Sequence, residues 1–109
     1  MKIDFKLMDE SVAHEFKGGK GDFISKTEND GLNKIIYGKL TKGSSIGLHT
    51  HETNSEIIYI LEGNGKCLYD DTEEKLSAGD CHYCPKGHAH SLINDSDDVL
   101  TFFAIVPEQ

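Results

Sequence analysis

Short extended segments separated by turns recur along the chain, and they constrain its fold more than any other feature of the sequence. Apolar β-branched and aromatic residues dominate these segments, and Gly, Asp or Asn residues interrupt them at intervals of roughly 8–12 residues. This pattern is typical of an all-β sandwich or barrel. We expect strands at residues 22–27, 34–40, 45–51, 56–62, 66–69, 74–76, 81–84, 90–93 and 99–106.

The N-terminal region carries two weaker signals. Ile3, Phe5 and Leu7 alternate with charged residues, which predicts an edge strand over Met1–Leu7. Because an exposed edge strand can pair with a second copy across a two-fold axis, we expect a homodimer. The helix signal is weak everywhere, and the best candidate is a short helix over Asp9–Phe16.

The charge balance excludes several classes of partner. The 109 residues hold 11 basic side chains, all of them Lys, against 19 acidic ones, for a net charge of −8. Nucleic-acid binding needs a basic face, and anionic membrane surfaces repel an acidic chain, so neither partner is expected. At this length one domain over residues 1–109 is expected.

Targeting signals and cysteine usage favour a cytoplasmic location. Charges alternate through the first seven residues, so no apolar core of a signal peptide is present there. No apolar run approaches the length of a membrane span. Three cysteines, an odd number, suit a reducing compartment better than a disulfide framework.

A cluster of His and Glu residues predicts a metal site. His49 and His51 are two apart in an extended segment, so both imidazoles face the same side at a Cα separation of about 6.5–7 Å. Glu56 begins the next strand on its apolar face, where a carboxylate needs a partner or a cation. His90 opens a third segment. Three imidazoles and one carboxylate suit a divalent transition metal (Mn, Fe, Co, Ni, Cu or Zn) and leave two positions of a six-coordinate ion open.

These residues resemble the two motifs of the cupin superfamily. The first motif spans residues 43–63 and reads Gly, five residues, His-x-His, four residues, Glu, six residues, Gly. The second spans residues 79–94 and reads Gly, five residues, Pro-x-Gly, two residues, His, three residues, Asn. The matching positions are Gly43, His49, His51, Glu56, Gly63, Gly79, Pro85, Gly87, His90 and Asn94.

The resemblance implies a double-stranded β-helix, or jelly-roll barrel, that holds one divalent metal. It assigns the metal to His49, His51, Glu56 and His90, the same set that the spacing indicates. Cupins with this ligand set include dioxygenases, isomerases and decarboxylases that act on small oxygenated molecules. We therefore favour a metal-dependent enzyme; the alternative is a non-catalytic module that binds a metal and a small organic acid or sugar. The motif glycines should lie at turns with unusual φ angles.

Several further residues are candidates for roles near the metal. His88 and His82 are the histidines that can serve as a catalytic base, although His88 also fits a rim or surface position and His82 a core position. Lys86 is the basic residue expected at the mouth of the site. Cys81 and Cys84 are three apart on a predicted strand, so they should face opposite sides and serve packing.

Overall fold

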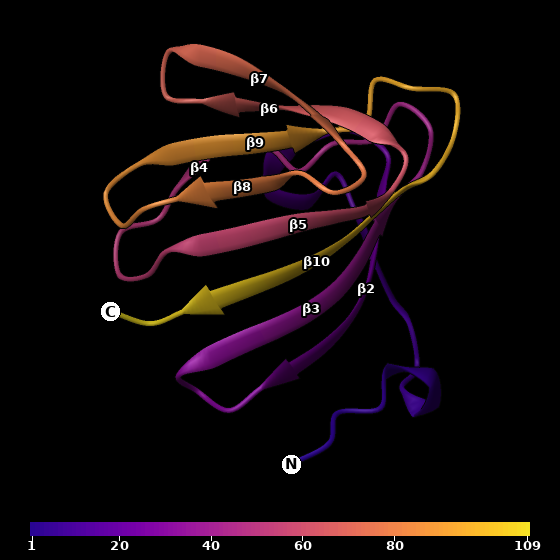
Figure 1. Cartoon of the computed structure of the whole chain (residues 1–109), viewed down its shortest axis with the longest axis vertical. Helices are drawn as coiled ribbons and strands as arrows, with labels where there is room; N and C mark the ends of the chain where they lie inside the picture. The colour runs from indigo at the N-terminus through magenta and orange to yellow at the C-terminus, as the bar shows by residue number, and fades with distance from the viewer.

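The computed structural model describes residues 1–109, which form two antiparallel sheets folded over each other (Figure 1). The larger sheet has the order β1-β2-β3-β10-β5-β8, and the smaller one has the order β4-β9-β6-β7. The strands of the larger sheet are β1 (Ser11–His14), β2 (Asp22–Asn29), β3 (Asn33–Leu40), β10 (Leu100–Pro107), β5 (Glu56–Glu62) and β8 (Cys81–Cys84). The strands of the smaller sheet are β4 (His49–Thr50), β9 (Ala89–Ile93), β6 (Asn64–Tyr69) and β7 (Thr72–Ser77).

The chain crosses repeatedly between the two sheets, which is the topology of a jelly roll. After β5 in the larger sheet it enters the smaller sheet as β6 and β7, returns as β8, crosses again as β9 and returns as β10 (Figure 1). The expected all-β jelly-roll fold is therefore confirmed. No helix in this fold has the length and hydropathy that a membrane span requires.

The core lies between the sheets and follows the alternation of the strands. On β5, Ile58 and Ile60 are buried, whereas Ile57, Tyr59 and Leu61 point outward and are each more than a third exposed. Opposite faces are also occupied by Cys81, which is exposed, and Cys84, which is buried. Period-2 alternation thus predicts the inward face of these strands correctly.

A stacked aromatic pair packs β2 against the side chains of β10. The rings of Phe23 on β2 and Phe102 on β10 are nearly parallel, with centroids 5.9 Å apart. A Cβ atom at Gly38 would lie only 2.6 Å from the Phe102 ring, so a glycine is required there on β3. The motif glycines have positive φ angles, as expected: +71° at Gly43, +92° at Gly63, +95° at Gly79 and +91° at Gly87.

The predicted edge strand over Met1–Leu7 is wrong. Phe5–Leu7 forms a short 3-10 helix (η1), and the Asp4 side chain accepts a hydrogen bond from the Lys6 amide at its start. The Phe5 ring packs beside Tyr37, at 5.9 Å between centroids. An alternating pattern indicates a strand only where a partner strand supplies the hydrogen bonds, and this segment has none.

The expected helix over Asp9–Phe16 is also wrong. Ser11–His14 is the edge strand β1, and it pairs antiparallel with the first residues of β2. A second 3-10 turn, η2 (Phe16–Gly18), reverses the chain between the two strands. In the segment expected to be extended over residues 45–51, only His49–Thr50 forms a strand, with an isolated bridge from Ser45 to Ile93.

Candidate metal centre

Three neighbouring elements bring the predicted metal ligands together. His49 lies on β4 and pairs in register with His90 on β9. His51 follows β4 directly, and Glu56 is the first residue of β5, on the same inward face as Ile58. Because β4 and β5 are joined by only a short turn, both ends of that turn point into the same end of the barrel.

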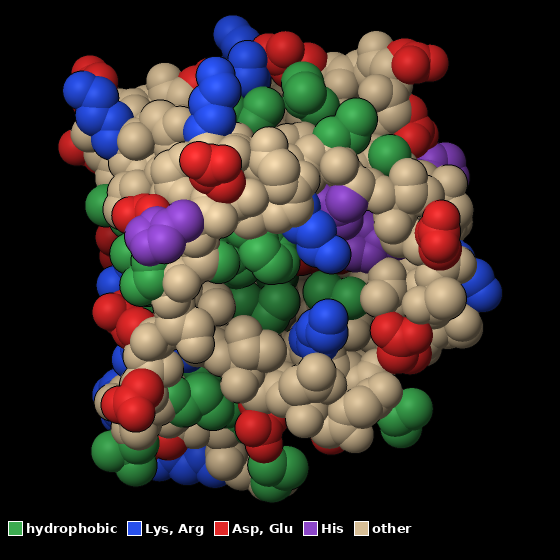
Figure 2. All heavy atoms as spheres, turned by 180° about the vertical axis from the view of Figure 1, so that it is seen from behind, with side chains coloured by type: hydrophobic (Ala, Val, Ile, Leu, Met, Phe, Trp, Pro, Cys, Tyr) green, Lys and Arg blue, Asp and Glu red, His purple; other side chains and the backbone are tan.

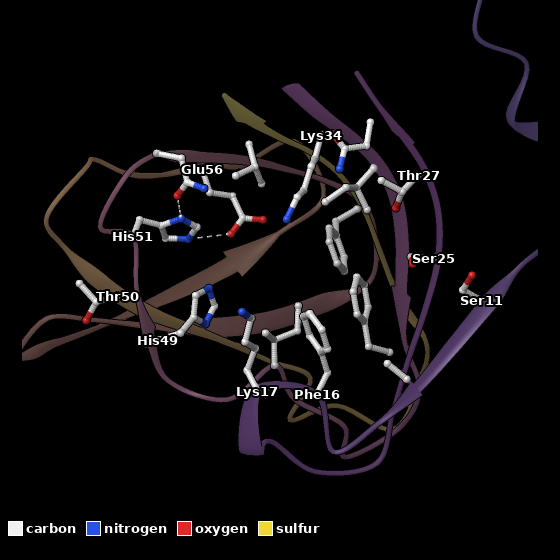
Figure 3. Close-up of a pocket in the computed structure, with 18 of the residues that line it drawn as sticks. Ser11, Phe16, Lys17, Ser25, Thr27, Lys34, His49, Thr50, His51 and Glu56 are labelled. Atoms are coloured by element: carbon white, nitrogen blue, oxygen red, sulfur yellow. Dashed lines mark hydrogen bonds and ion pairs between the residues drawn. The ribbon is translucent and has the colours of Figure 1, made fainter. Parts of the chain in front are cut away.

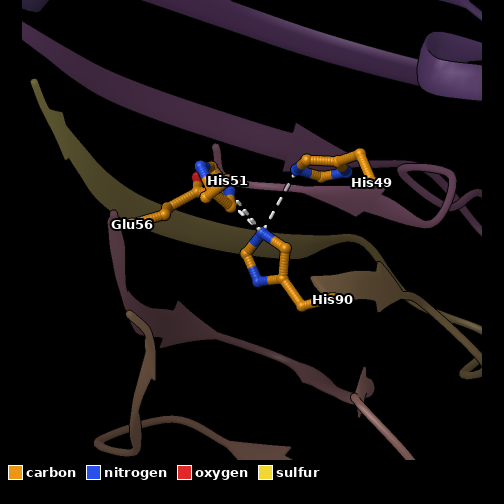
Figure 4. Close-up of side chains that lie close together, drawn as sticks. All are labelled: His49, His51, Glu56 and His90. Carbon is orange, nitrogen blue, oxygen red and sulfur yellow. Dashed lines mark hydrogen bonds and ion pairs between the residues drawn. The ribbon is translucent and has the colours of Figure 1, made fainter. Parts of the chain in front are cut away.

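The side chains of His49, His51, Glu56 and His90 meet in one compact group, called the acceptor cluster below (Figure 4). Their potential ligand atoms all lie within 4.8 Å of one another. The Nε2 atom of His90 lies 2.9 Å from that of His51 and 3.2 Å from that of His49. Glu56 Oε1 lies 2.9 Å from His90 Nε2 and 3.2 Å from His51 Nε2. All but His49 are buried.

The Nδ1 atoms of His49 and His51, opposite the Nε2 atoms in each ring, are held by acceptor oxygens. His49 Nδ1 donates to the Gly47 carbonyl at 2.7 Å, and His51 Nδ1 donates to Asn54 Oδ1 at 2.6 Å. The amide of Asn54 is oriented in turn, since its Nδ2 donates to Glu108 Oε1 at 2.9 Å. In a neutral imidazole a proton on Nδ1 leaves Nε2 as an acceptor. Both Nε2 atoms therefore present lone pairs to the cluster.

A chain of three side chains fixes the third histidine in the same way. Glu74 Oε1 accepts from His82 Nδ1 at 2.8 Å, so His82 Nε2 is an acceptor in the neutral ring. His82 Nε2 then accepts from His90 Nδ1 at 3.0 Å. His90 Nε2 consequently carries a lone pair, like the other two. Hydrogen-bond partners of this kind set the orientation and tautomer of metal-binding histidines.

Four acceptor atoms therefore face one another without a donor between them. Such an arrangement is unfavourable unless a proton or a metal ion sits in the middle. When a proton rather than a metal ion occupies this position, it lies in hydrogen bonds between Glu56 and the Nε2 atoms of His51 and His90. Burial is then the largest influence on the pKa of Glu56 and acts to raise it, but these hydrogen bonds outweigh burial and lower the pKa to about 2. The hydrogen bond with Glu56 also raises the pKa of His51, whereas burial lowers the pKa of His49. The donor set of nitrogen and carboxylate oxygen fits a divalent transition metal.

The acceptor cluster forms one end of a cavity of about 570 Å³ (Figure 3). Seen from behind, apolar side chains line this hollow, with lysine and histidine side chains on one side of it (Figure 2). Lys17 and Lys34 are its basic residues, and sequence reasoning missed both. On β3, Lys34 is an even number of residues from Ile36 and Leu40, so it lies on the same face of the strand, and this alternation could have indicated its position. Lys17 lies in the turn η2, where no periodic pattern exists.

Several residues predicted to lie near the metal are elsewhere. His88 does not line the cavity: its Nδ1 donates to Asp70 Oδ2 at 2.7 Å, and its side chain is 44% exposed. His82 is buried behind His90 and does not reach the cavity either. The expectation for Lys86 is wrong, because its Nζ donates to the Gln109 carbonyl at 3.2 Å, away from the cavity. Asn94 lies in the loop after β9 and away from the acceptor cluster, where its Nδ2 donates to the carbonyls of Leu40 and Asp98.

Comparison with known families agrees with this geometry. The model of the family described as "Cupin domain" matches residues 37–106, which contain the whole acceptor cluster. The chain belongs to the cupin family. Members often bind a divalent metal, and this cupin has a His/Glu cluster able to hold one.

Two relatives illustrate the range of the family. This cupin is 34% identical over 96 residues to the oxalate-binding protein of Thermotoga maritima, covering 83% of this chain and 79% of that protein. It is 27% identical over 113 residues to quercetin 2,3-dioxygenase of Bacillus subtilis, covering 94% of this chain and 34% of that enzyme. The chain thus spans only about a third of the second relative's length.

Solved structures show the same fold. A predicted oxalate decarboxylase from Thermotoga maritima superposes with a TM-score of 0.93 at 28% identity, with 100% of both chains covered. The cupin domain of Cnp3 from Schizosaccharomyces pombe has a TM-score of 0.80 at 9% identity, covering 100% of this chain and 74% of that one. At so low an identity the second likeness shows the fold alone.

Proposed function

We propose that this cupin is a small metal-dependent enzyme of the dioxygenase, isomerase or decarboxylase type, acting on a small oxygenated organic molecule. The observation that carries the proposal is the acceptor cluster, in which the partners of three Nδ1 atoms leave four acceptors facing one point. The proposed ligands of one divalent metal are His49, His51, Glu56 and His90.

The cavity gives the centre an approach for a second molecule. A structural metal site is closed by protein ligands, whereas a catalytic one keeps positions open. Here His49, His51 and Glu56 line the 570 Å³ cavity, so the open side of the centre faces a space of ligand size. When bound, the metal would polarise a carbonyl or carboxylate oxygen as a Lewis acid. The side chains that line the cavity would orient the ligand beside it.

The alternative is a non-catalytic module that binds a metal and a small organic acid or sugar. Two observations favour it: neither His82 nor His88 lines the cavity, and one relative is named as an oxalate-binding protein. Turnover separates the two functions. An enzyme converts an organic acid only when metal-loaded, whereas a module binds the acid and returns it unchanged.

The test begins with the metal content of protein purified without chelators or nickel resin. We expect one equivalent of a divalent transition metal in the wild type and none in His51→Ala. The control is His14→Ala, because that histidine pairs with Asp22 on the surface. Full metal occupancy in His51→Ala would overturn the proposed centre. Assays of decarboxylation, oxygen uptake and isomerisation with the loaded protein then decide between enzyme and binding module.

We also propose that the protein is a cytoplasmic homodimer. The outer faces of β5 and β8 expose Ile57, Tyr59, Leu61 and Tyr83, an apolar surface of the kind that interfaces cover. The three cysteines are all unpaired, which suits a reducing compartment. Light scattering tests the dimer, and a monomeric mass at micromolar concentration would contradict it.

A further inference from the structure

Two lysines that lack a carboxylate partner line the cavity. Ion pairs join Lys39, Lys42 and Lys66 to acidic side chains, but no carboxylate oxygen lies within 4.0 Å of the ammonium group of Lys17 or Lys34. Most of the eleven lysines form no such ion pair, so what distinguishes Lys17 and Lys34 is their position at the cavity. Their pairing capacity is left for something that enters the cavity.

Both ammonium groups point into the cavity from opposite walls (Figure 3). Lys34 extends from β3 toward Glu56, and Lys17 extends from η2 toward His49. The two therefore flank the open side of the proposed metal. A divalent ion together with two lysines outweighs the negative charges of Glu52 and Glu56 at the cavity. This end of the cavity is consequently suited to an anion.

The backbone at Lys17 is held in a costly conformation. Lys17 has φ +57° and Glu15 has φ +51°, and a non-glycine residue in this left-handed region costs about 1–2 kcal/mol. The segment is fixed by Gly47, whose amide donates to the Phe16 carbonyl at 2.9 Å. A Cβ at Gly47 would collide with the Lys17 carbonyl oxygen. Since the Gly47 carbonyl also orients His49, one glycine couples the position of Lys17 to the metal centre.

The rest of the cavity is large and mainly apolar. Beyond the lysines its wall includes the aromatic and branched aliphatic side chains of Phe16, Phe23, Ile36, Ile46, Phe102 and Val106, with Ser11, Ser25, Thr27 and Asn29 among its polar residues. Its volume of about 570 Å³ lies well inside the ~300–1,000 Å³ range of small-molecule sites. Oxalate has two carboxylates and no hydrocarbon part, so it would leave this apolar wall in contact with water.

We infer that the ligand of this cavity is a carboxylate with an apolar tail the size of an aromatic ring. The carboxylate lies at the open side of the metal between Lys17 and Lys34, and the tail lies against Phe16 and its apolar neighbours. This inference rests on the proposed function, because it places the acid group beside the proposed metal. It differs from that function in excluding oxalate and other tail-less acids as the preferred ligands.

The test uses calorimetric titration of the full chain loaded with one equivalent of Mn²⁺. Pyruvate and phenylpyruvate differ only by the phenyl ring, and oxalate is the third probe. Because burial of a ring of this size is favourable, we expect phenylpyruvate to bind at least about tenfold more tightly than pyruvate. Phe16→Ala should reduce that preference. Val12→Asn, at another residue of the cavity wall, is the second variant should Phe16→Ala fold poorly.

Lysine variants test the charged end of the site. Lys17→Met and Lys34→Met should each weaken all three acids by roughly tenfold, since each removes a charged hydrogen-bond donor. Lys42→Met is the matched control, because Lys42 pairs with Asp97 on the surface. This variant should leave the affinities for all three acids unchanged.

The outcomes separate this inference from the proposed function. Equal affinities for pyruvate and phenylpyruvate in protein that holds its Mn²⁺ would overturn the inference and leave the metal centre standing. Unchanged affinities in both lysine variants would also overturn it. Failure to bind Mn²⁺ at one equivalent would overturn the proposed centre itself.

Discussion

His82 provides the sharpest test of how the metal centre is built, because it touches a proposed ligand without touching the cavity. Its Nε2 atom is the acceptor for His90 Nδ1 at 3.0 Å, and its side chain is buried. His82→Phe removes that acceptor but keeps an aromatic ring, which can still stack on His90 as the native ring does at 5.2 Å. The variant therefore isolates the hydrogen bond from the packing.

The expected loss of metal affinity follows from the two states that are open to His90 in this variant. Its Nδ1–H either stays unpaired in a buried site, at a cost of about 1–3 kcal/mol, or its proton moves to Nε2 and removes the lone pair that would bind the metal. Loss of such supporting partners lowers metal affinity by about 10–100-fold, or about 1.4–2.8 kcal/mol. We therefore expect a 10–100-fold weaker metal affinity in His82→Phe.

The assay is competitive titration of Co²⁺ or Zn²⁺ against a chromogenic chelator. Tyr83→Phe is the control, since Tyr83 is on the same strand but points outward and is 54% exposed. Glu74→Leu should have a smaller effect, because the Glu74 side chain is 41% exposed and water can replace it at His82 Nδ1. A folded His82→Phe variant whose affinity is within about twofold of wild type would refute this account of the hydrogen-bond chain.

Three other outcomes follow from burial and charge. Because the pKa of Glu56 is lowered from 4.5 to about 2 in the fold, the metal-free protein should lose about 3 kcal/mol of stability as pH falls from 4.5 to 2, and Glu56→Gln should lose this dependence in acid denaturation. A β-carbon in Gly47→Ala cannot be accommodated, so its melting temperature should fall by several degrees; an unchanged one would contradict the close packing. Ellman's reagent should label Cys81 quickly but Cys67 and Cys84 only after unfolding, since burial raises the pKa of the latter two to about 12 and about 11; fast labelling of all three would be inconsistent with this fold.

Local patterns in the sequence predict most of the strands and the residues of the acceptor cluster. Alternation at Glu56, Ile58 and Ile60 is a property of the backbone, so their common inward face follows from strand geometry alone. The same pattern is misleading at Met1–Leu7. There, alternation is present without a neighbouring strand, and strand formation depends on the partner as much as on the segment.

The sequence by itself determined an all-β sandwich or barrel and the four candidate ligands, because both depend on residue type and short-range spacing. The jelly roll followed from the resemblance of the two motifs to those of cupins. Only the tertiary structure decided what surrounds those ligands. Glu74 on the smaller sheet contacts His82 on the larger sheet, and His82 in turn contacts His90 on the smaller sheet. Lys17 reaches the cavity from a turn with an unfavourable φ angle. Such contacts depend on how the two sheets pack, and no periodicity in the sequence links them. The preference for a carboxylate with an apolar tail is accordingly a property of the assembled cavity.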